Sequence, residues 1–188
     1  MEYKLICVTN RHIAGGDLYK QVFKVVDGSN KPDILILREK DMQEDEYKDL
    51  AARIMKICLD NGVLCILHYF KEVALELGAC GIHLPFSVFM DMPGEEKKRF
   101  KITGVSVHSK EEAVSAQKMG ASYIIAGHIF ETGCKEGIKP RGLGFLKEIC
   151  QQVDIPVYAI GGINMENAVS CIEEGAKGIC MMSGFMKL

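Results

Sequence analysis

Eight short apolar runs alternate along this chain with longer segments in which apolar residues recur at helical spacing. The predicted strands are residues 4–9, 34–37, 63–67, 81–84, 102–107, 123–126, 157–160 and 178–182. The predicted helices are residues 18–26, 45–61, 70–77, 110–119, 144–152 and 165–174, and segment 85–100 predicts at most one irregular turn. Strands that are apolar almost throughout, each followed by a crossover, are typical of a parallel sheet covered by helices.

Eight such units favour a closed (β/α)8 barrel, the TIM barrel architecture. A doubly wound open sheet would show the same alternation, but Gly15 and Gly16 do not complete the GxGxxG motif expected after its first strand. At 188 residues the chain suits a single compact domain over residues 1–188.

The amino-acid composition limits the classes of molecule that this chain can be expected to bind. The 23 basic and 25 acidic residues nearly cancel and form no basic block, which argues against nucleic-acid or membrane-surface binding. No apolar run approaches the roughly 20 residues that span a bilayer, and no signal peptide is recognisable. The eight cysteines lie mostly in apolar runs, as buried thiols of a reducing compartment do. We expect a cytoplasmic protein that acts on a small molecule.

A histidine follows the sixth predicted strand, where barrel enzymes collect their catalytic groups. His128 stands in a loop that runs from Gly127 to residue 137. Because an imidazole titrates near neutrality, it suits proton transfer, and we predict that His128 is catalytic. Thr132 and Lys135 in the same loop could hold an anionic substrate, whereas packing is the favoured role of Cys134, since a nucleophilic thiol needs a depressed pKa.

Other strand ends carry candidate anion ligands. Arg38 and Lys40 end the second strand, where they either bind an anion or form a solvated loop paired with Glu39. Ser106 closes the fifth strand as a candidate ligand contact. Two further candidate pairs, Gly161-Gly162 and Ser183-Gly184, end the seventh and eighth strands. Barrel enzymes often bind phosphate between these last two loops, although a glycine pair can also simply make a tight turn.

The pattern does not favour a metal site or a cofactor. Magnesium prefers oxygen ligands, yet the third and fourth strands have no acidic residue at their tips. Asp91, Glu95 and Glu96 lie farther along and are expected to be solvated. His83, inside the fourth strand, is expected to be satisfied by ordinary hydrogen bonds.

Motifs spread over essentially the whole chain resemble the thiamine phosphate synthase superfamily, a family of barrels. They are LREK at 37–40, GIHL at 81–84, GVSVHSKEEA at 104–113, GHIFETGCK at 127–135, IGGI at 160–163 and SG at 183–184. The run GHIFETGCKEG, followed by PRG at 140–142, is similar to the TenI branch, the thiazole tautomerases. That branch has histidine after glycine where the synthases usually have proline.

This resemblance implies roles for the matching residues. His128 matches the acid/base histidine of the tautomerases, and Thr132 and Lys135 match the family's threonine and lysine in the same loop. Residues 161–162 and 183–184 match the loops that hold the phosphate of the thiazole. The implied reaction needs no cofactor: a carboxythiazole bearing an ethyl phosphate becomes aromatic by proton transfer. We expect Arg38 or Lys135 to bind its ring carboxylate.

Departures from the synthase pattern bear on the choice of branch. Where synthases have an Asn-Asp pair after the third strand, this chain has His68-Tyr69, and residues 86–88 replace their glutamine and acidic residues. The resemblance therefore implies that the metal–diphosphate clamp is missing, although Lys40 matches the synthases. Two alternatives stay open: a synthase that couples a pyrimidine diphosphate to thiazole phosphate, and a protein that binds thiazole phosphate without turnover.

The resemblance also implies a final helix, yet little sequence follows the eighth predicted strand. The final helix is therefore expected to be truncated or missing. We expect a partner subunit, as in a homodimer, or other segments of the chain to mask the strip of barrel left uncovered.

Overall fold

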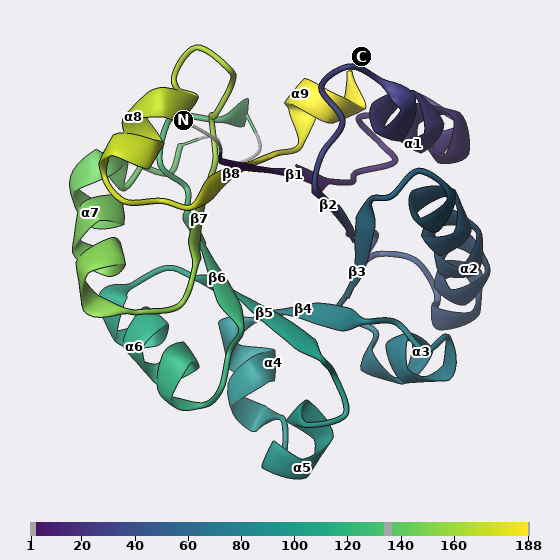
Figure 1. Ribbon diagram of the computed structural model, residues 1–188, viewed down its shortest axis with the longest axis horizontal. Helices are drawn as coiled ribbons and strands as arrows, with labels where there is room; N and C mark the ends of the chain where they lie inside the picture. The colour runs from purple at the N-terminus through teal and green to yellow at the C-terminus, as the bar shows by residue number, and fades with distance from the viewer. Residues whose placement is uncertain (1–2, 134–136, 188) are drawn as a thin grey trace.

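A computed structural model of the chain describes residues 3–133 and 137–187, and its strands close into a parallel barrel (Figure 1). The strands are β1 Lys4–Val8, β2 Ile34–Leu37, β3 Leu64–His68, β4 Gly81–Pro85, β5 Ile102–Val107, β6 Tyr123–Gly127, β7 Val157–Ile160 and β8 Gly178–Met181. Each strand pairs with its neighbours in sequence, and β1 closes the ring by pairing with β8, from Lys4 opposite Gly178 to Cys7 opposite Met181. The predicted barrel is confirmed, and the open sheet is excluded.

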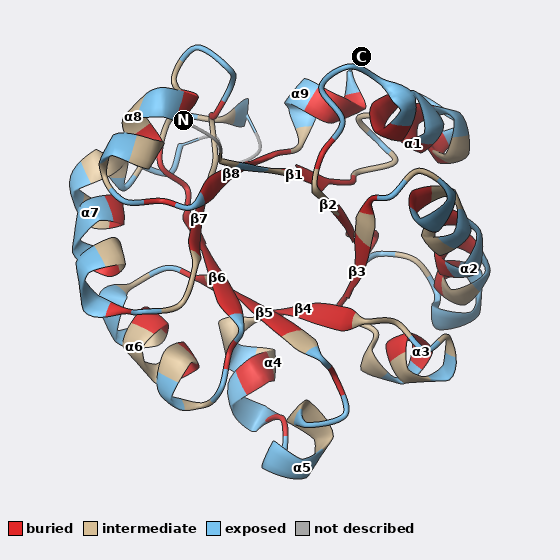
Figure 2. Cartoon of the chain, viewed as in Figure 1, coloured by how far each residue is buried: buried red, intermediate tan, exposed pale blue. Residues whose placement is uncertain are grey.

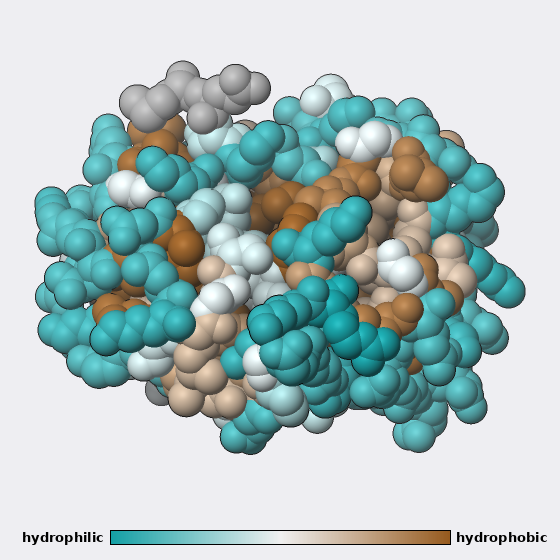
Figure 3. All heavy atoms as spheres, turned by 60° about the horizontal axis from the view of Figure 1, so that its bottom comes forward, coloured by the Kyte–Doolittle hydropathy of each residue, from teal (hydrophilic) through white to brown (hydrophobic). Residues whose placement is uncertain are grey.

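Helices surround the barrel between successive strands (Figure 1). They are α1 Leu18–Asp27, α2 Glu44–Asp60, α3 Lys71–Glu76, α4 Phe86–Asp91, α5 Gly94–Lys97, α6 Lys110–Lys118, α7 Gly142–Gln152, α8 Ala168–Glu173 and α9 Ser183–Met186. Figure 2 shows buried residues on the strands and on the helix faces that meet them. Figure 3 shows one face of the molecule, on which hydrophilic residues predominate and smaller hydrophobic areas lie between them.

Alternate residues of each strand face two separate apolar layers. One side packs against the helices, as Leu35 and Leu67 do. The other side fills the barrel interior, as Ile36 and Ile66 do. Because side chains alternate along a strand with period two, the residues two positions beyond the interior ones face the inside of the barrel at its carboxyl end.

Two segments differ from the prediction by more than two residues. The segment expected to hold at most one irregular turn contains α4 and α5. Pro85 and Pro93 stand directly before these helices, where a fixed φ favours a helix start, and Pro93 also prevents α4 from continuing. α8 begins at Ala168 rather than at residue 165, because Asn164 accepts hydrogen bonds from the amides of Glu166 and Asn167 and holds them in a turn.

The last helix is a single short turn rather than absent, which confirms the truncated form of the prediction. Phe185 and Met186 of α9 are buried, and the side-chain amide of Gln21 in α1 donates to the carbonyl of Phe185 over 2.6 Å. Part of α9 is therefore buried within the chain itself, and the homodimer stays a prediction.

Tyr47 of α2 forms hydrogen bonds with the ends of two strands. Its ring is fully buried, and its hydroxyl donates to the carbonyl of Leu37 over 2.7 Å and accepts from the amide of His68 over 3.0 Å. Burial raises the pKa of Tyr47 well above its usual value, so the hydroxyl keeps its proton. Tyr47 thereby fixes the ends of β2 and β3 relative to each other.

We expect Tyr47→Phe to lower the free energy of unfolding by about 2 kcal/mol, because it leaves a buried carbonyl and a buried amide unpaired. Urea titration of both proteins measures this loss. Tyr19→Phe is the control, since Tyr19 is only partly buried on the outer helix α1. Equal stability of Tyr47→Phe and the parent would show that the two strand ends hold without this bridge.

Candidate active site at the carboxyl ends of the strands

Arg38 and His68 follow interior residues by two positions, so both face the inside of the barrel mouth. β2 and β3 pair with Leu37 opposite Leu67, which brings Arg38 beside His68. The positive charges of Arg38 and Lys40 both act on His68. The structure therefore gathers two predicted anion ligands at one side of the mouth.

Glu39, between these two cations, is bound elsewhere. Its carboxylate is buried and accepts from the hydroxyl of Thr9 over 2.7 Å. It also forms an ion pair with Arg11 over 3.2 Å. The alternative of a solvated loop paired through Glu39 does not hold. Sequence reasoning missed this buried carboxylate because Thr9 and Arg11 lie about thirty positions away in sequence and meet Glu39 only once β1 and β2 pair.

Ser106 joins a hydrogen-bonded chain with two buried rings. The Nε2 atom of His83 lies 2.8 Å from the hydroxyl of Ser106, and its Nδ1 atom lies 3.1 Å from the hydroxyl of Tyr123. Burial, followed by the charge of Arg38, lowers the pKa of His83 to about 3. His83 is thus a neutral ring that orients Ser106, in line with the expectation that ordinary hydrogen bonds satisfy it.

His68 lies next to His83 in the folded barrel, and the sequence pattern predicts no role for it beyond the replacement of asparagine. Its ring stacks on that of His83 with centroids 6.0 Å apart, and only 5% of the residue is exposed. Burial first, then repulsion between the protonated forms of the two histidine rings and the charges of Arg38 and Lys40, lower its pKa to about 2. His68 is therefore a second neutral imidazole inside a positively charged mouth.

His128 lies at the mouth directly after β6. The residue is 5% exposed, and its Nε2 atom lies 3.1 Å from the carbonyl oxygen of Ile138. A carbonyl only accepts, so this contact needs the hydrogen on Nε2 and, in the neutral ring, leaves Nδ1 as the basic nitrogen. The backbone is also fixed, because the amide of Arg141 donates to the His128 carbonyl over 3.0 Å.

Gly161 and Gly162 form the surface against which the His128 loop packs. Both have positive φ, at 102° and 65°, a conformation that favours glycine. A Cβ atom on Gly161 would lie 2.2 Å from the Cβ of His128, and one on Gly162 would lie 2.2 Å from the carbonyl oxygen of Glu131. The glycines thus let the loops after β6 and β7 approach each other and place His128 beside the predicted phosphate loop.

We expect Gly161→Ala to displace His128 and to lower the free energy of unfolding by about 1–3 kcal/mol, the usual range for overpacking. Thermal unfolding measures the loss, and the His128 ring signals in an NMR spectrum report the displacement. Gly144→Ala is the matched control, because a Cβ there meets nothing within 4 Å. An unchanged His128 signal in Gly161→Ala would contradict the proposed contact.

The remaining predicted ligands are Ser183, Gly184, Thr132 and Lys135. Ser183 and Gly184 are exposed and begin α9 directly after β8, which pairs with β7, so the start of α9 and the glycine loop follow neighbouring strands. Thr132 is partly buried in the His128 loop. Lys135 and Cys134 lie outside the described residues. The ligand roles of the four residues and the packing role of Cys134 stay predictions.

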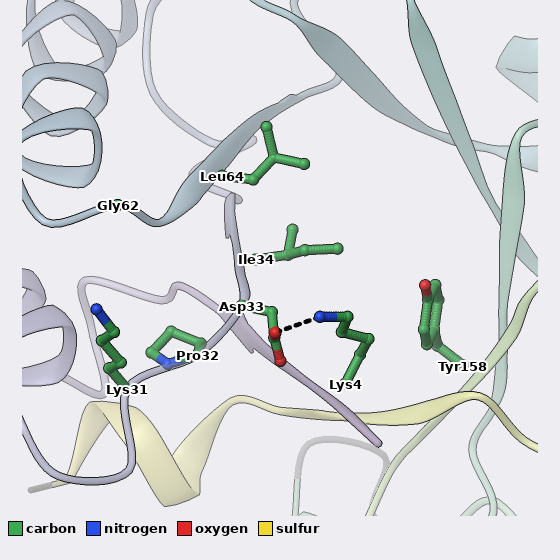
Figure 4. A pocket seen from close by; sticks show the side chains of 8 residues that line it. All are labelled: Lys4, Lys31, Pro32, Asp33, Ile34, Gly62, Leu64 and Tyr158. Carbon is green, nitrogen blue, oxygen red and sulfur yellow. Dashed lines mark hydrogen bonds and ion pairs between the residues drawn. The ribbon is translucent and has the colours of Figure 1, made fainter. Parts of the chain in front are cut away.

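Two hollows in the described part of the chain lie away from the mouth. Figure 4 shows the first, about 460 Å³ in volume, at the amino ends of β1 to β3. Its wall includes the ion pair between Lys4 and Asp33, whose atoms are 2.6 Å apart. The second, about 350 Å³, lies beside the start of β7, near Cys150 and Glu174. Neither hollow contains a predicted site residue, and the amino end of a barrel usually serves stability.

Comparison with known proteins identifies the family. The sequence model of the family described as thiamine monophosphate synthase (TMP-TENI) matches residues 5–185. The chain belongs to the thiamine monophosphate synthase family. This confirms the predicted superfamily.

Individual members of the thiamine monophosphate synthase family are similar over nearly the whole chain. Thiamine-phosphate synthase of Clostridium acetobutylicum is 37% identical over 191 residues, which cover 99% of this chain and 88% of that protein. Thiamine-phosphate synthase of Clostridium novyi is 34% identical over 193 residues, covering 100% and 92%. The structure of thiamine phosphate pyrophosphorylase from Pyrococcus furiosus matches with a TM-score of 0.84 at 31% identity, covering 99% and 88%. Because these relatives carry the synthase name, the TenI branch stays a prediction.

Residues 3–133 and 137–187 contain neither a membrane-spanning helix nor a cluster of three metal-binding side chains. No helix there is long and apolar enough to cross a membrane. No three histidine, cysteine, aspartate or glutamate side chains there gather closely enough to hold a metal ion.

Proposed function

We propose that this chain is a thiazole tautomerase of thiamine biosynthesis, which aromatises a carboxythiazole ethyl phosphate. The observation that carries the proposal is the position of His128, held through Nε2 by the Ile138 carbonyl and packed against Gly161. This arrangement leaves one basic nitrogen on a fixed ring beside a glycine loop.

The proposed reaction moves one proton. His128 takes a proton from the non-aromatic ring, and the electron pair released forms the ring double bond. The exocyclic carbon then receives the proton back from the same imidazole, so the ring becomes aromatic with no net change in atoms or charge. A positioned acid/base group contributes about 10²–10⁴ in rate, and aromaticity supplies the driving force.

The phosphate is proposed to lie between the loops after β7 and β8. Backbone amides at 161–162 and 183–184 are the proposed donors, since glycine lets the backbone come close to an anion. This anchor would hold the ring at His128 and limit its motion during proton transfer.

Coupling of a pyrimidine diphosphate to thiazole phosphate is the second candidate, and the comparisons favour it. The relatives at 37% and 34% identity are named thiamine-phosphate synthase, and Arg38 and Lys40 provide positive charge at the mouth. Against it, His68 and Tyr69 stand where the resemblance implies an Asn-Asp pair in synthases, and residues 86–88 carry no carboxylate.

Two assays on the purified protein decide between the candidates. In the first, NMR follows conversion of the non-aromatic carboxythiazole phosphate. In the second, thiazole phosphate, hydroxymethylpyrimidine diphosphate and Mg²⁺ are supplied, and released diphosphate is measured. We expect conversion in the first and none in the second. Diphosphate release alone would establish the synthase, and affinity for thiazole phosphate without either turnover would establish a binding protein.

A further inference from the structure

The carboxyl end of β3 has a buried polar atom without a partner. The Nδ1 atom of His68 is fully buried and has no hydrogen-bond partner in the described part of the chain. Buried polar atoms are nearly always paired, so an unpaired one needs an explanation. Here the atom belongs to a residue at the mouth rather than in the apolar core.

The buried Nδ1 determines which nitrogen of His68 is available. The ring is neutral, because burial and the neighbouring charges lower its pKa to about 2, so it carries a single N–H. Nδ1 stays unpaired in either tautomer, but orphaned buried N–H donors are rarer in proteins than under-satisfied acceptors, which places the hydrogen on Nε2. The Nε2 atom is not among the buried unpaired atoms, so it can donate to an oxygen atom of a ligand.

The backbone beside His68 is held in a strained conformation. Tyr69 has φ of 73°, which is uncommon for a bulky residue and occurs mainly at functional sites. Its amide donates to the carbonyl of His83 over 3.1 Å, and its ring is 44% exposed. The ring lies nearly parallel to that of His68, with centroids 6.2 Å apart, so an aromatic face stands at the mouth next to the free donor.

The positive charges near His68 favour an anionic ligand. Arg38 and Lys40 act on His68 from β2, while the nearby carboxylate of Glu39 is already bound by Thr9 and Arg11. A neutral donor flanked by cations matches a carboxylate, which only accepts hydrogen bonds when ionised.

We propose that His68, Tyr69 and Arg38 form a carboxylate subsite that selects the carboxylated thiazole phosphate over the form without the carboxylate. In the closed ring β3 lies four strands from β7 in either direction, so this subsite faces the proposed phosphate loop across the mouth. The inference rests on the proposed function and deepens it. The substrate is then an elongated molecule with an anion at each end and its ring between them.

Calorimetric titration with two probes tests the subsite. The probes are the aromatic carboxythiazole ethyl phosphate and the same thiazole phosphate without the carboxylate. A hydrogen bond to a charged group contributes about 1.5–3 kcal/mol, so the parent protein should bind the carboxylated probe at least about tenfold more tightly. Equal affinity for the two probes, or no binding of either, would overturn the inference without any variant being needed.

Variants then assign the selectivity to His68. His68→Phe keeps a flat ring without nitrogen. We expect it to weaken binding of the carboxylated probe about tenfold and binding of the other probe less than about twofold. His68→Gln keeps an N–H donor and should retain part of the selectivity. It replaces His68→Phe in the test if that variant does not fold. His12→Phe is the matched control, because His12 is exposed and paired with Asp41. Equal weakening of both probes by His68→Phe would show a merely structural role.

Failure of the inference and failure of the proposed function give different results. Selective binding without NMR conversion would remove the tautomerase but keep the subsite. Conversion without selective binding would keep the tautomerase and remove the subsite.

Discussion

Replacing His128 with asparagine is expected to slow thiazole aromatisation by about 10²–10⁴-fold, the usual contribution of a positioned acid/base group. Asparagine matches histidine only as far as Nδ1, so it gives up the contact that Nε2 makes with the Ile138 carbonyl at 3.1 Å, and it has no group that can carry the proton. Because only this one hydrogen bond is lost, we expect the fold and the phosphate loop to survive. NMR-monitored conversion of the non-aromatic substrate measures the rate, and calorimetry with thiazole phosphate measures the binding.

His108→Asn is the control for the His128 variant. His108 is an exposed histidine at the same mouth, and its Nδ1 lies 2.9 Å from the carbonyl of Gly127. We expect this variant to keep more than about a tenth of the rate, because only one partly exposed hydrogen bond is changed. A His128→Asn protein that converts substrate at the parent rate would remove His128 from the mechanism.

Stability is expected to fall by about 3 kcal/mol for each pH unit below about 6, because two buried histidines must stay neutral in the folded protein. The pKa of His68 is lowered to about 2 and that of His83 to about 3, whereas histidine in an unfolded chain titrates near 6.5. Between these values the unfolded chain binds more protons, so acid favours unfolding. The stabilisation is complete above about pH 6.5 and is lost progressively as the pH falls toward the folded pKa values.

Urea unfolding at intervals between about pH 4.5 and 7 measures this slope. The carboxylates of Asp33 and Asp41, whose pKa values are lowered by their basic partners, lose their contribution mainly below about pH 4, so this range isolates the histidines. His83→Gln removes one of the two groups and should roughly halve the slope. A free energy of unfolding that stays flat from pH 7 to 5 would mean that the two rings take up protons without unfolding.

The barrel could be predicted from the sequence because apolar residues follow one regular pattern within each strand and each of the longer helices. Strands apolar on both faces, such as 123–126, cannot be stable unless helices cover one side and a barrel interior the other. The same argument fails for residues 85–100, where the two short helices are set by Pro85 and Pro93 rather than by an apolar repeat.

The candidate site could be predicted only where a single loop carries the signal. His128 and the glycine pair are visible in sequence because each stands next to a strand end. The neutral state of His68 depends instead on burial and on Arg38 and Lys40 from another strand, which spacing along the chain does not report. The close approach of Gly161 to His128 likewise joins two loops whose contact only the folded barrel creates.

Pairing of the first strand with the last has a consequence for biosynthesis of the protein. β1 cannot pair with β8 until residues 178–181 have left the ribosome, since Lys4 pairs with Gly178 and Cys7 with Met181. Until then the growing sheet keeps two unpaired edges, which invite pairing with other chains. Such long-range closure is slow, so assistance from chaperones during synthesis would matter most in the interval just before β8 emerges.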